Sequence, residues 1–356
     1  MQNRFTRWIM LAFLGCLAGL TLYVNAQRPR ILVVHSYHTD YIWTQQINQG
    51  LERIFRGRSL IDIQYHYMNV KNFKEKSNLR RAGIAARHAV DAIRPDILLV
   101  VDDDAQALVA QHYVKDPTIQ IVHAGINNDP ESYGYSHADN VTGILERKPL
   151  AAIKDLLLLV GTQGREKRAA HGGGDQEAVA PAIRALFLSD RSTSVRMDAQ
   201  FLETFAWAPV EYKGNLAVQS FREWQDVIRR VDELADIVLV GGYRELTREG
   251  GAGFVTPQEV MRWTEAHSAR PVIGMNLFNA ADGAMLSLGI SPFEQGEVAA
   301  RMALRILDHG VKAATIPTRM PEQYVVSMRH SLLAKRGIQL PSIFEAFSRS
   351  TNSFFE

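Results

Sequence analysis

Short apolar runs alternate with amphipathic helical patterns along most of this chain of 356 residues. Continuous apolar runs such as "RILVVHS" and "DILLVV" are typical of parallel strands that are covered on both faces. After the first run, Ile47, Leu51 and Phe55 recur at helical spacing. Strands that alternate with helices indicate βαβ units and parallel sheets. Because the alternation continues in the second half, the sequence predicts two open, Rossmann-like α/β lobes of about 120 residues each.

Several helix boundaries can be predicted from capping residues. Thr256, Pro257 and Glu259 have the spacing of a capping box, with proline at the first helical position. A second box begins at Ser291, and Gly310 is placed to end the helix that follows.

Residues 161–181, "GTQGREKRAAHGGGDQEAVAP", interrupt the pattern. Their polar character and three consecutive glycines predict a flexible surface loop between a helix and a strand. A phosphate-binding loop is disfavoured, because no strand leads directly into the glycines and no Gly-Lys-Ser/Thr follows them.

The first 26 residues predict export. Arg4 and Arg7 precede an apolar run, and "VNA" before Gln27 suits signal peptidase, as in a cleavable secretory signal peptide. An uncleaved anchor helix is the alternative. Lipidation at Cys16 is disfavoured, because Leu14 is bulky for that signal and the apolar run continues past the cysteine. The expected location is the periplasm.

Net charge and cysteine content exclude several classes of function. Removal of residues 1–26 takes away two of the 40 basic residues and none of the 38 acidic ones, so the mature chain is near neutral. This balance lacks the basic footprint of a nucleic-acid binder. The single cysteine leaves with the signal, so the mature chain has no disulfide or thiolate site.

Candidate ligand-binding residues follow the predicted strands, because open α/β sheets bind ligands beyond the carboxyl ends of their strands. Polar, hydrogen-bonding and aromatic side chains at these positions suit a small polar ligand with an apolar part. The candidates are Ser36, Tyr37, Asp102, Asp103, Asn127, Asp190, Tyr243 and Asn276.

Each candidate also has a structural interpretation. Among Asp102, Asp103 and Asp104, at least one is expected to cap the following helix, and Asp103 is expected to face the ligand. Trp43 either packs on its own lobe or covers the ligand. Tyr243 follows two glycines that would leave room for a ligand, so its ring is expected to be exposed.

Catalysis and metal binding are weaker interpretations. Ser36 lacks the Gly-x-Ser-x-Gly turn of a serine nucleophile. A metal site would rest on His35 and His38, but His35 is expected to point into the sheet. We therefore expect no catalytic residue, no metal and no cofactor.

The sequence resembles the ABC-transporter substrate-binding proteins of the type I periplasmic-binding fold, in the branch that includes aromatic-amino-acid binders and extracytoplasmic sensor modules. The resemblance runs from about residue 31 to residue 341. It is carried by "VVHSYHTDYIWTQQINQG", "RPDILLVVDDDAQ", "IVHAGINNDPESYGY", "NVTGILE", "SFREWQ", "GAMLSLGISPFEQGEVAARMALRIL" and "GIQLP".

The resemblance implies two lobes joined by a three-segment hinge, with the ligand between them. The crossings are expected near residues 142–146, 275–276 and 317–322. Lobe 1 would comprise residues 27–144 and 277–318, and lobe 2 residues 145–276 and 319–356. Ser36 and Tyr37 would form the lobe 1 floor, where a helix N-terminus favours an anionic ligand group.

The expected function is that of a periplasmic solute-binding component of an ABC transporter. Its lobes would close on a small polar or aromatic ligand, such as an amino acid, for delivery to a permease in the inner membrane. The alternative is a soluble extracytoplasmic sensor that reports its ligand to a membrane kinase or cyclase. A periplasmic hydrolase is the third possibility.

Overall fold

A computed structural model describes residues 2–73, 75–171, 182–251 and 253–356. Internal contacts divide the chain into two compact units. Unit 1 comprises Met1–Leu145 and Pro292–Arg319, and unit 2 comprises Glu146–Ser291 and Met320–Glu356. The chain therefore passes between the units three times.

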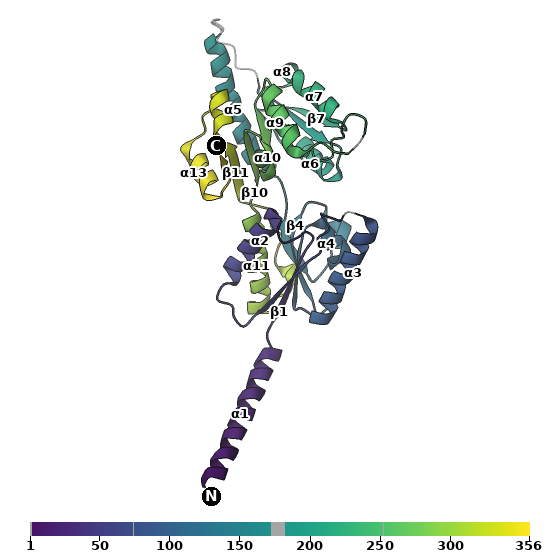
Figure 1. The fold of residues 1–356 in the computed structure, drawn as a ribbon, viewed down its shortest axis with the longest axis vertical. Coiled ribbons are helices and arrows are strands. Elements are labelled where there is room, and N and C mark those ends of the chain that lie inside the picture. Colours follow the sequence, from purple (N-terminus) through teal and green to yellow (C-terminus); the bar gives the residue numbers. More distant parts are fainter. Residues whose placement is uncertain (1, 74, 172–181, 252) are drawn as a thin grey trace. The chain divides into compact units, whose positions relative to one another are not determined.

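Unit 1 is built on a five-stranded parallel sheet of order β2-β1-β3-β4-β5 (Figure 1). Its strands are β1 (Arg30–His35), β2 (Asp62–Tyr67), β3 (Ile97–Val101), β4 (Gln120–Ile126) and β5 (Val141–Leu145). Its helices are α2 (Ile42–Phe55), α3 (Lys76–Ile93), α4 (Asp103–Leu108) and α11 (Pro292–His309), with short 3₁₀ turns η1 (Ala110–Tyr113), η2 (Pro130–Tyr133) and η3 (Ala313–Thr315).

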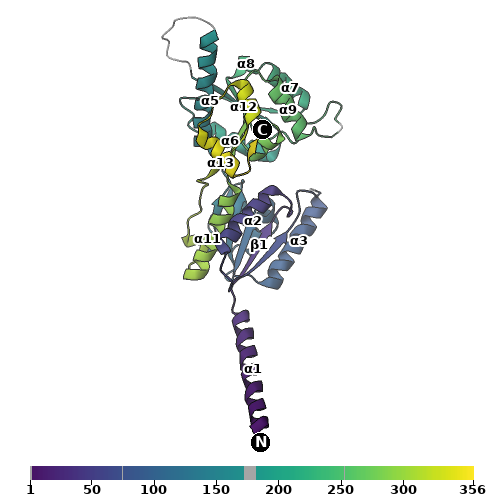
Figure 2. The same ribbon diagram turned by 60° about the vertical axis from the view of Figure 1, so that its left-hand side comes forward.

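Both faces of this sheet are buried, as the continuous apolar runs predict. Ile31 and Val33 of β1 belong to the core that includes α2 and α11, whereas Leu32 belongs to the core on the other face, which includes α3 and α4. Helices α2 and α11 lie side by side in both ribbon views (Figures 1 and 2). A Cβ at Gly50 would lie 2.3 Å from the carbonyl oxygen of Phe293, so glycine is required for this close approach.

Unit 2 is built on a seven-stranded sheet of order β12-β11-β10-β9-β8-β6-β7, parallel except for the β10–β11 pair. Its strands are β6 (Arg184–Asp190), β7 (Glu211–Val218), β8 (Ile237–Val240), β9 (Val272–Gly274), β10 (Leu286–Ile290), β11 (Tyr324–Arg329) and β12 (Phe354–Phe355). Its helices are α5 (Leu150–His171), α6 (Thr193–Thr204), α7 (Phe221–Arg229), α8 (Val231–Leu234), α9 (Pro257–His267), α10 (Leu277–Asp282), α12 (His330–Arg336) and α13 (Ser342–Ser350).

The second crossing lies later than residues 275–276, where it was predicted. Residues 277–291 belong to unit 2 because β10 pairs with β9 on one side and with β11 on the other. The chain enters unit 1 again only at Pro292, the first residue of α11. The pairing of β10 could not be recognised from local pattern, since it depends on a strand that follows about 40 residues later.

Local predictions had mixed outcomes. Helix α9 begins at Pro257, and the Thr256 hydroxyl accepts a hydrogen bond from the Glu259 amide at 3.3 Å, as predicted. The predicted loop at 161–181 is wrong for residues 161–171, which continue α5, and residues 172–181 lie outside the described residues. Helix propensity in "REKRAAH" outweighs the polar character that suggested a loop.

The N-terminal segment forms helix α1 (Gln2–Ala26). Within it, Arg7–Asn25 is long and apolar enough to cross a membrane, as signal sequences also are. Cleavage after residue 26 stays a prediction.

Candidate functional site

Ser36, at the carboxyl end of β1, is buried and caps a neighbouring helix. Its hydroxyl donates to the Val101 carbonyl oxygen at 2.9 Å and accepts from the Ala105 amide at 2.8 Å. The Asp102 side chain makes no such cap for α4, although Asp102 occupies the N-cap position. Ser36 therefore supplies, from another strand, the capping oxygen that was expected from an aspartate.

Asp102 and Trp43 contact each other in unit 1. The Trp43 indole nitrogen donates to Asp102 Oδ1 at 2.9 Å, and the aspartate is buried. Asp102 has a φ of 68°, a left-handed value that costs about 1–3 kcal/mol in a residue other than glycine. This bond fixes the Trp43 ring against unit 1. Because Trp43 is only half-buried, part of the ring remains accessible to solvent.

Asp103 organises the segment that follows β4. Its carboxylate accepts from the backbone N–H groups of Asn127 and Asn128 at 3.2 and 3.1 Å, and from the Tyr133 hydroxyl at 2.8 Å. Burial and the nearby negative charge of Asp103 raise the pKa of the Tyr133 hydroxyl. The structure thus brings the predicted residues Asp103 and Asn127 together, and both stay partly exposed.

Tyr37 belongs to an aromatic and cationic group that sequence reasoning found only in part. Its ring lies edge-on to that of Tyr41, with centroids 5.3 Å apart. The Lys71 ammonium lies 4.7 Å from the Tyr37 centroid and 3.6 Å from that of Tyr41, within cation–π range. Lys71 was missed, although its place after the alternating strand "IDIQYHY" was a usable signal.

His35, as expected, points into the sheet and is fully buried. Its Nε2 lies 2.8 Å from Asn48 Oδ1, and its ring stacks on Tyr67 with centroids 5.3 Å apart. Burial lowers the pKa of His35 to about 4, against a weaker opposing effect of the Asn48 bond.

Asp190, at the end of β6 in unit 2, is buried and holds two loops. Its Oδ1 accepts from the Ser192 amide and hydroxyl at 3.0 and 2.6 Å, and its Oδ2 accepts from the Glu245 amide at 3.0 Å. The side chain is therefore turned toward the polypeptide that surrounds it.

Tyr243 is fully buried, so the expectation of an exposed ring is wrong. The ring packs edge-on against Trp224, with centroids 5.9 Å apart, and its hydroxyl donates to Asp282 Oδ2 at 2.8 Å. The two glycines before it leave no free space, because a Cβ at Gly241 would lie 2.6 Å from Phe187 and one at Gly242 2.4 Å from Val195. Because these glycines lack side chains, the core residues Phe187 and Val195 can pack against them, in the space that was expected for a ligand.

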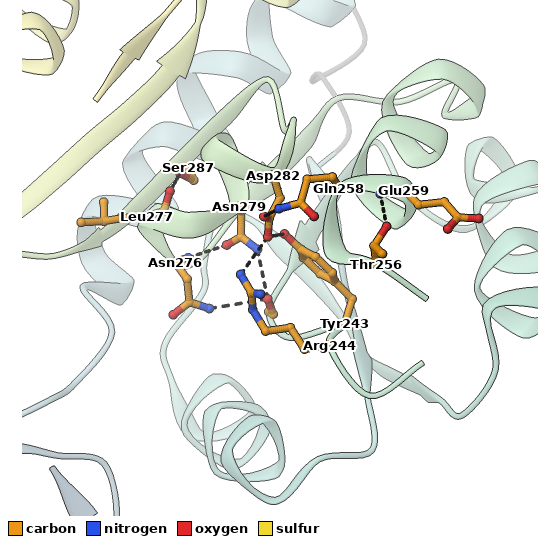
Figure 3. Close-up of polar contacts among 11 residues, drawn as sticks. Tyr243, Arg244, Thr256, Gln258, Glu259, Asn276, Leu277, Asn279, Asp282 and Ser287 are labelled. Atoms are coloured by element: carbon orange, nitrogen blue, oxygen red, sulfur yellow. Dashed lines mark hydrogen bonds and ion pairs between the residues drawn. The ribbon is translucent and has the colours of Figure 1, made fainter. Parts of the chain in front are cut away.

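Figure 3 shows that the Asp282 carboxylate accepts hydrogen bonds from several polar side chains. Besides Tyr243, Arg244 Nη2 donates to its Oδ2 at 2.9 Å and Gln258 Nε2 to its Oδ1 at 2.8 Å. Burial raises the pKa of Asp282, and the positive charge of Arg244 opposes that rise. Arg244 also lies over the Phe278 ring, 4.4 Å from its centroid. Sequence reasoning missed Asp282, which follows no strand.

Asn276, at the start of α10, joins the ends of two strands to the segment after β5. Its Oδ1 accepts from Lys148 Nζ at 2.5 Å, and its Nδ2 donates weakly to the Gly241 carbonyl oxygen at 3.5 Å. Lys148 Nζ lies 3.8 Å from Asp198 Oδ2. Lys148 was missed because it follows a strand that crosses between units, where no ligand contact was sought.

No protein-family model matches the chain, and no curated protein matches it either. Solved structures do match. An open, ligand-free substrate binding protein with adhesive properties from Clostridium difficile has a TM-score of 0.65 at 15% identity, covering 88% of this chain and 96% of its own. An ABC domain in complex with L-Trp from Streptococcus pneumonia has a TM-score of 0.56 at 16% identity, covering 89% and 98%.

A conserved domain protein from Vibrio cholerae gives a similar result, with a TM-score of 0.57 at 14% identity over 90% of this chain and 98% of its own. At these identities the likeness establishes the fold. Two α/β units with mainly parallel sheets, linked by three chain crossings, define the type I periplasmic-binding fold. The prediction of this fold is confirmed.

Proposed function

We propose that this chain is an extracytoplasmic solute-binding protein that takes up a small polar or aromatic molecule, such as an amino acid, at the strand ends of its two units. The observation that carries the proposal is the type I fold with partly exposed polar and aromatic side chains at these ends, Tyr37, Trp43, Asp103 and Asn276 among them. Open α/β sheets bind ligands at this edge. The apolar N-terminal helix supports export.

Transport is the favoured role. A solute-binding protein of an ABC transporter delivers its ligand to a permease in the inner membrane, and this chain would do so without chemical change to the ligand. Two structural neighbours support this reading: one is named as a substrate binding protein, and another was solved in complex with L-Trp.

Sensing is the second candidate, since a sensor would use the same strand ends and pass its ligand state to a membrane kinase or cyclase. Neighbouring genes for a permease and an ATPase would favour transport, and a neighbouring signalling gene alone would favour sensing. A hydrolase is the third candidate, and it would release an altered ligand that mass spectrometry detects.

The direct test is a thermal-shift screen of the purified mature protein against amino acids, nucleobases and small organic acids. A ligand at 100 times its dissociation constant stabilises the folded state by about 2.7 kcal/mol. Failure of every small solute to bind at micromolar concentration would remove the main support for this proposal.

A further inference from the structure

Three donor groups converge at the carboxyl end of the unit 2 sheet. Lys148 follows β5, Asn276 follows β9, and Arg244 follows β8. Figure 3 shows the side chains of Asn276 and Arg244 directed toward each other. Asn276 accepts from Lys148 through its side-chain oxygen, and its nitrogen contacts the carbonyl oxygen of Gly241, at the strand end that also carries Arg244.

The charge of Lys148 is only partly compensated. Its side chain is 8% exposed, and its nearest partner is the neutral oxygen of Asn276 at 2.5 Å. Asp198 Oδ2 lies at 3.8 Å, beyond ordinary hydrogen-bond distance. Burial raises the pKa of Asp198, and the positive charges of Lys148 and Arg147 oppose that rise. A buried ammonium whose nearest carboxylate oxygen lies at 3.8 Å gains from a further, closer negative partner.

Arg244 has donor capacity to spare. Its side chain is 45% exposed, and within the described part of the chain only its Nη2 has a hydrogen-bond partner, Asp282. A guanidinium offers five N–H donors in a planar fork that matches a carboxylate. The Phe278 ring beneath it holds the fork in place.

Asp190, another acid at this edge, does not oppose an incoming anion by direct contact. Both oxygens of Asp190 are occupied by N–H and O–H donors of Ser192 and Glu245. Lys148, Asn276 and Arg244 therefore present donors to the same region.

We infer that Lys148, Asn276 and Arg244 form an anion-binding site in unit 2 that recognises the carboxylate of the ligand. This inference rests on the proposed function and makes it more specific. The solute is an organic carboxylate, and residues of unit 2 bind its negatively charged group. The position differs from the lobe 1 floor at Ser36 and Tyr37, where the sequence favoured an anion.

The test uses pairs of probes that differ only in charge. The purified mature protein is titrated by calorimetry with the proteinogenic amino acids and small carboxylic acids, each beside its primary amide. The amide keeps the size and shape of the acid but lacks the negative charge. We expect a carboxylate to bind at least about tenfold more tightly than its amide.

The variants Lys148→Met and Arg244→Gln then locate the effect. Each is expected to weaken binding of the acid about tenfold to a hundredfold and to leave binding of the amide nearly unchanged. Arg248→Gln is the matched control, because Arg248 is 44% exposed and pairs with Glu259 at 3.0 Å, much as Arg244 pairs with Asp282. Lys148→Arg should restore the preference for the acid, since it restores the charge.

Other results would overturn the inference. Equal weakening of acid and amide in Lys148→Met would mean that Lys148 has only a structural role. If wild-type protein binds a neutral solute as tightly as any acid, the anion site is refuted while the proposed function stands. If no small solute binds at all, the proposed function fails, and the anion site fails with it.

Discussion

The Trp43 indole nitrogen donates a hydrogen bond to the buried carboxylate of Asp102 across 2.9 Å, from the first turn of α2 to the end of β3. Both residues were candidates for ligand contact, and the fold uses them first on each other. A ligand that stacks on the exposed part of Trp43 would meet a ring whose orientation is already set, which lowers the entropy lost on binding.

The variant Trp43→Phe tests this bond. It keeps an aromatic ring but removes a donor to a buried carboxylate, so we expect a loss of about 1–3 kcal/mol in the free energy of unfolding, measured by urea denaturation. Trp263→Phe is the control, since within the described residues the indole nitrogen of Trp263 has no hydrogen-bond partner to lose. Like Trp43, Trp263 is half-buried. Equal losses in both variants would mean that ring size, not the hydrogen bond, matters.

Ser36→Ala is expected to act on stability. It removes the acceptor for the Ala105 amide and the donor to Val101, which should cost about 1–2 kcal/mol of unfolding free energy. The same change at exposed Ser331, which donates only to the Glu356 carbonyl oxygen, should cost less than about 0.5 kcal/mol. A Ser36→Ala variant of wild-type stability with lost ligand affinity would restore Ser36 as a ligand contact.

Asp103 remains a candidate for ligand contact, because it is partly exposed. Asp103→Ala is expected to weaken ligand binding about tenfold to a hundredfold in calorimetric titration. It also removes the acceptor for two loop amides, so circular dichroism must accompany the titration. Asp40→Ala, which removes an exposed carboxylate near the same edge, is the control. Unchanged affinity in folded Asp103→Ala would exclude it from the site.

Tyr243→Ala, by contrast, should damage the fold. Truncation of a fully buried aromatic residue costs about 3–5 kcal/mol, and here it also leaves Asp282 without one of its donors. Tyr243→Phe keeps the ring and should cost only about 1–3 kcal/mol. Chemical denaturation of both variants measures the difference. A Tyr243→Ala variant with wild-type stability would contradict the observed burial.

His35 predicts a loss of stability in acid. Its pKa is 6.5 when exposed and about 4 when buried, so between these values the unfolded chain holds a proton that the folded chain does not. The contribution of His35 is therefore fully present above pH 6.5 and is lost as the pH falls through about 4, by about 3 kcal/mol in total.

Denaturation of wild type and His35→Gln from neutral pH to pH 4 checks this. The glutamine does not titrate, so the stability advantage of wild type should shrink by about 3 kcal/mol over that range. His137→Gln, at an exposed histidine, should follow wild type throughout. If the difference in unfolding free energy between wild type and His35→Gln stays constant with pH, the pKa of His35 is the same in the folded and the unfolded chain.

Local sequence pattern predicted the elements whose determinants lie within one stretch of chain. The runs at β1, β3, β6 and β8 are buried on both faces, and such strands consist of continuous apolar residues. Thr256 and Gly310 mark helix ends because a cap is a contact with the next few residues, and Gly310 indeed takes a φ of 62° after α11. Strands β10 and β11 were not predicted, because their antiparallel pairing joins segments that are distant in the sequence.

By itself, the sequence determined the class of fold and which residues reach the carboxyl ends of the strands, because hydrophobic periodicity and chain order are local properties. Only the tertiary structure decided what those residues do there. Ser36 caps a helix that begins 67 positions after it, Tyr243 turns into the core to meet Asp282, and Lys148 meets Asn276 from 128 residues away. A side chain at a strand end can face solvent or its neighbours, and the choice depends on hydrogen-bond partners that distant segments bring within reach.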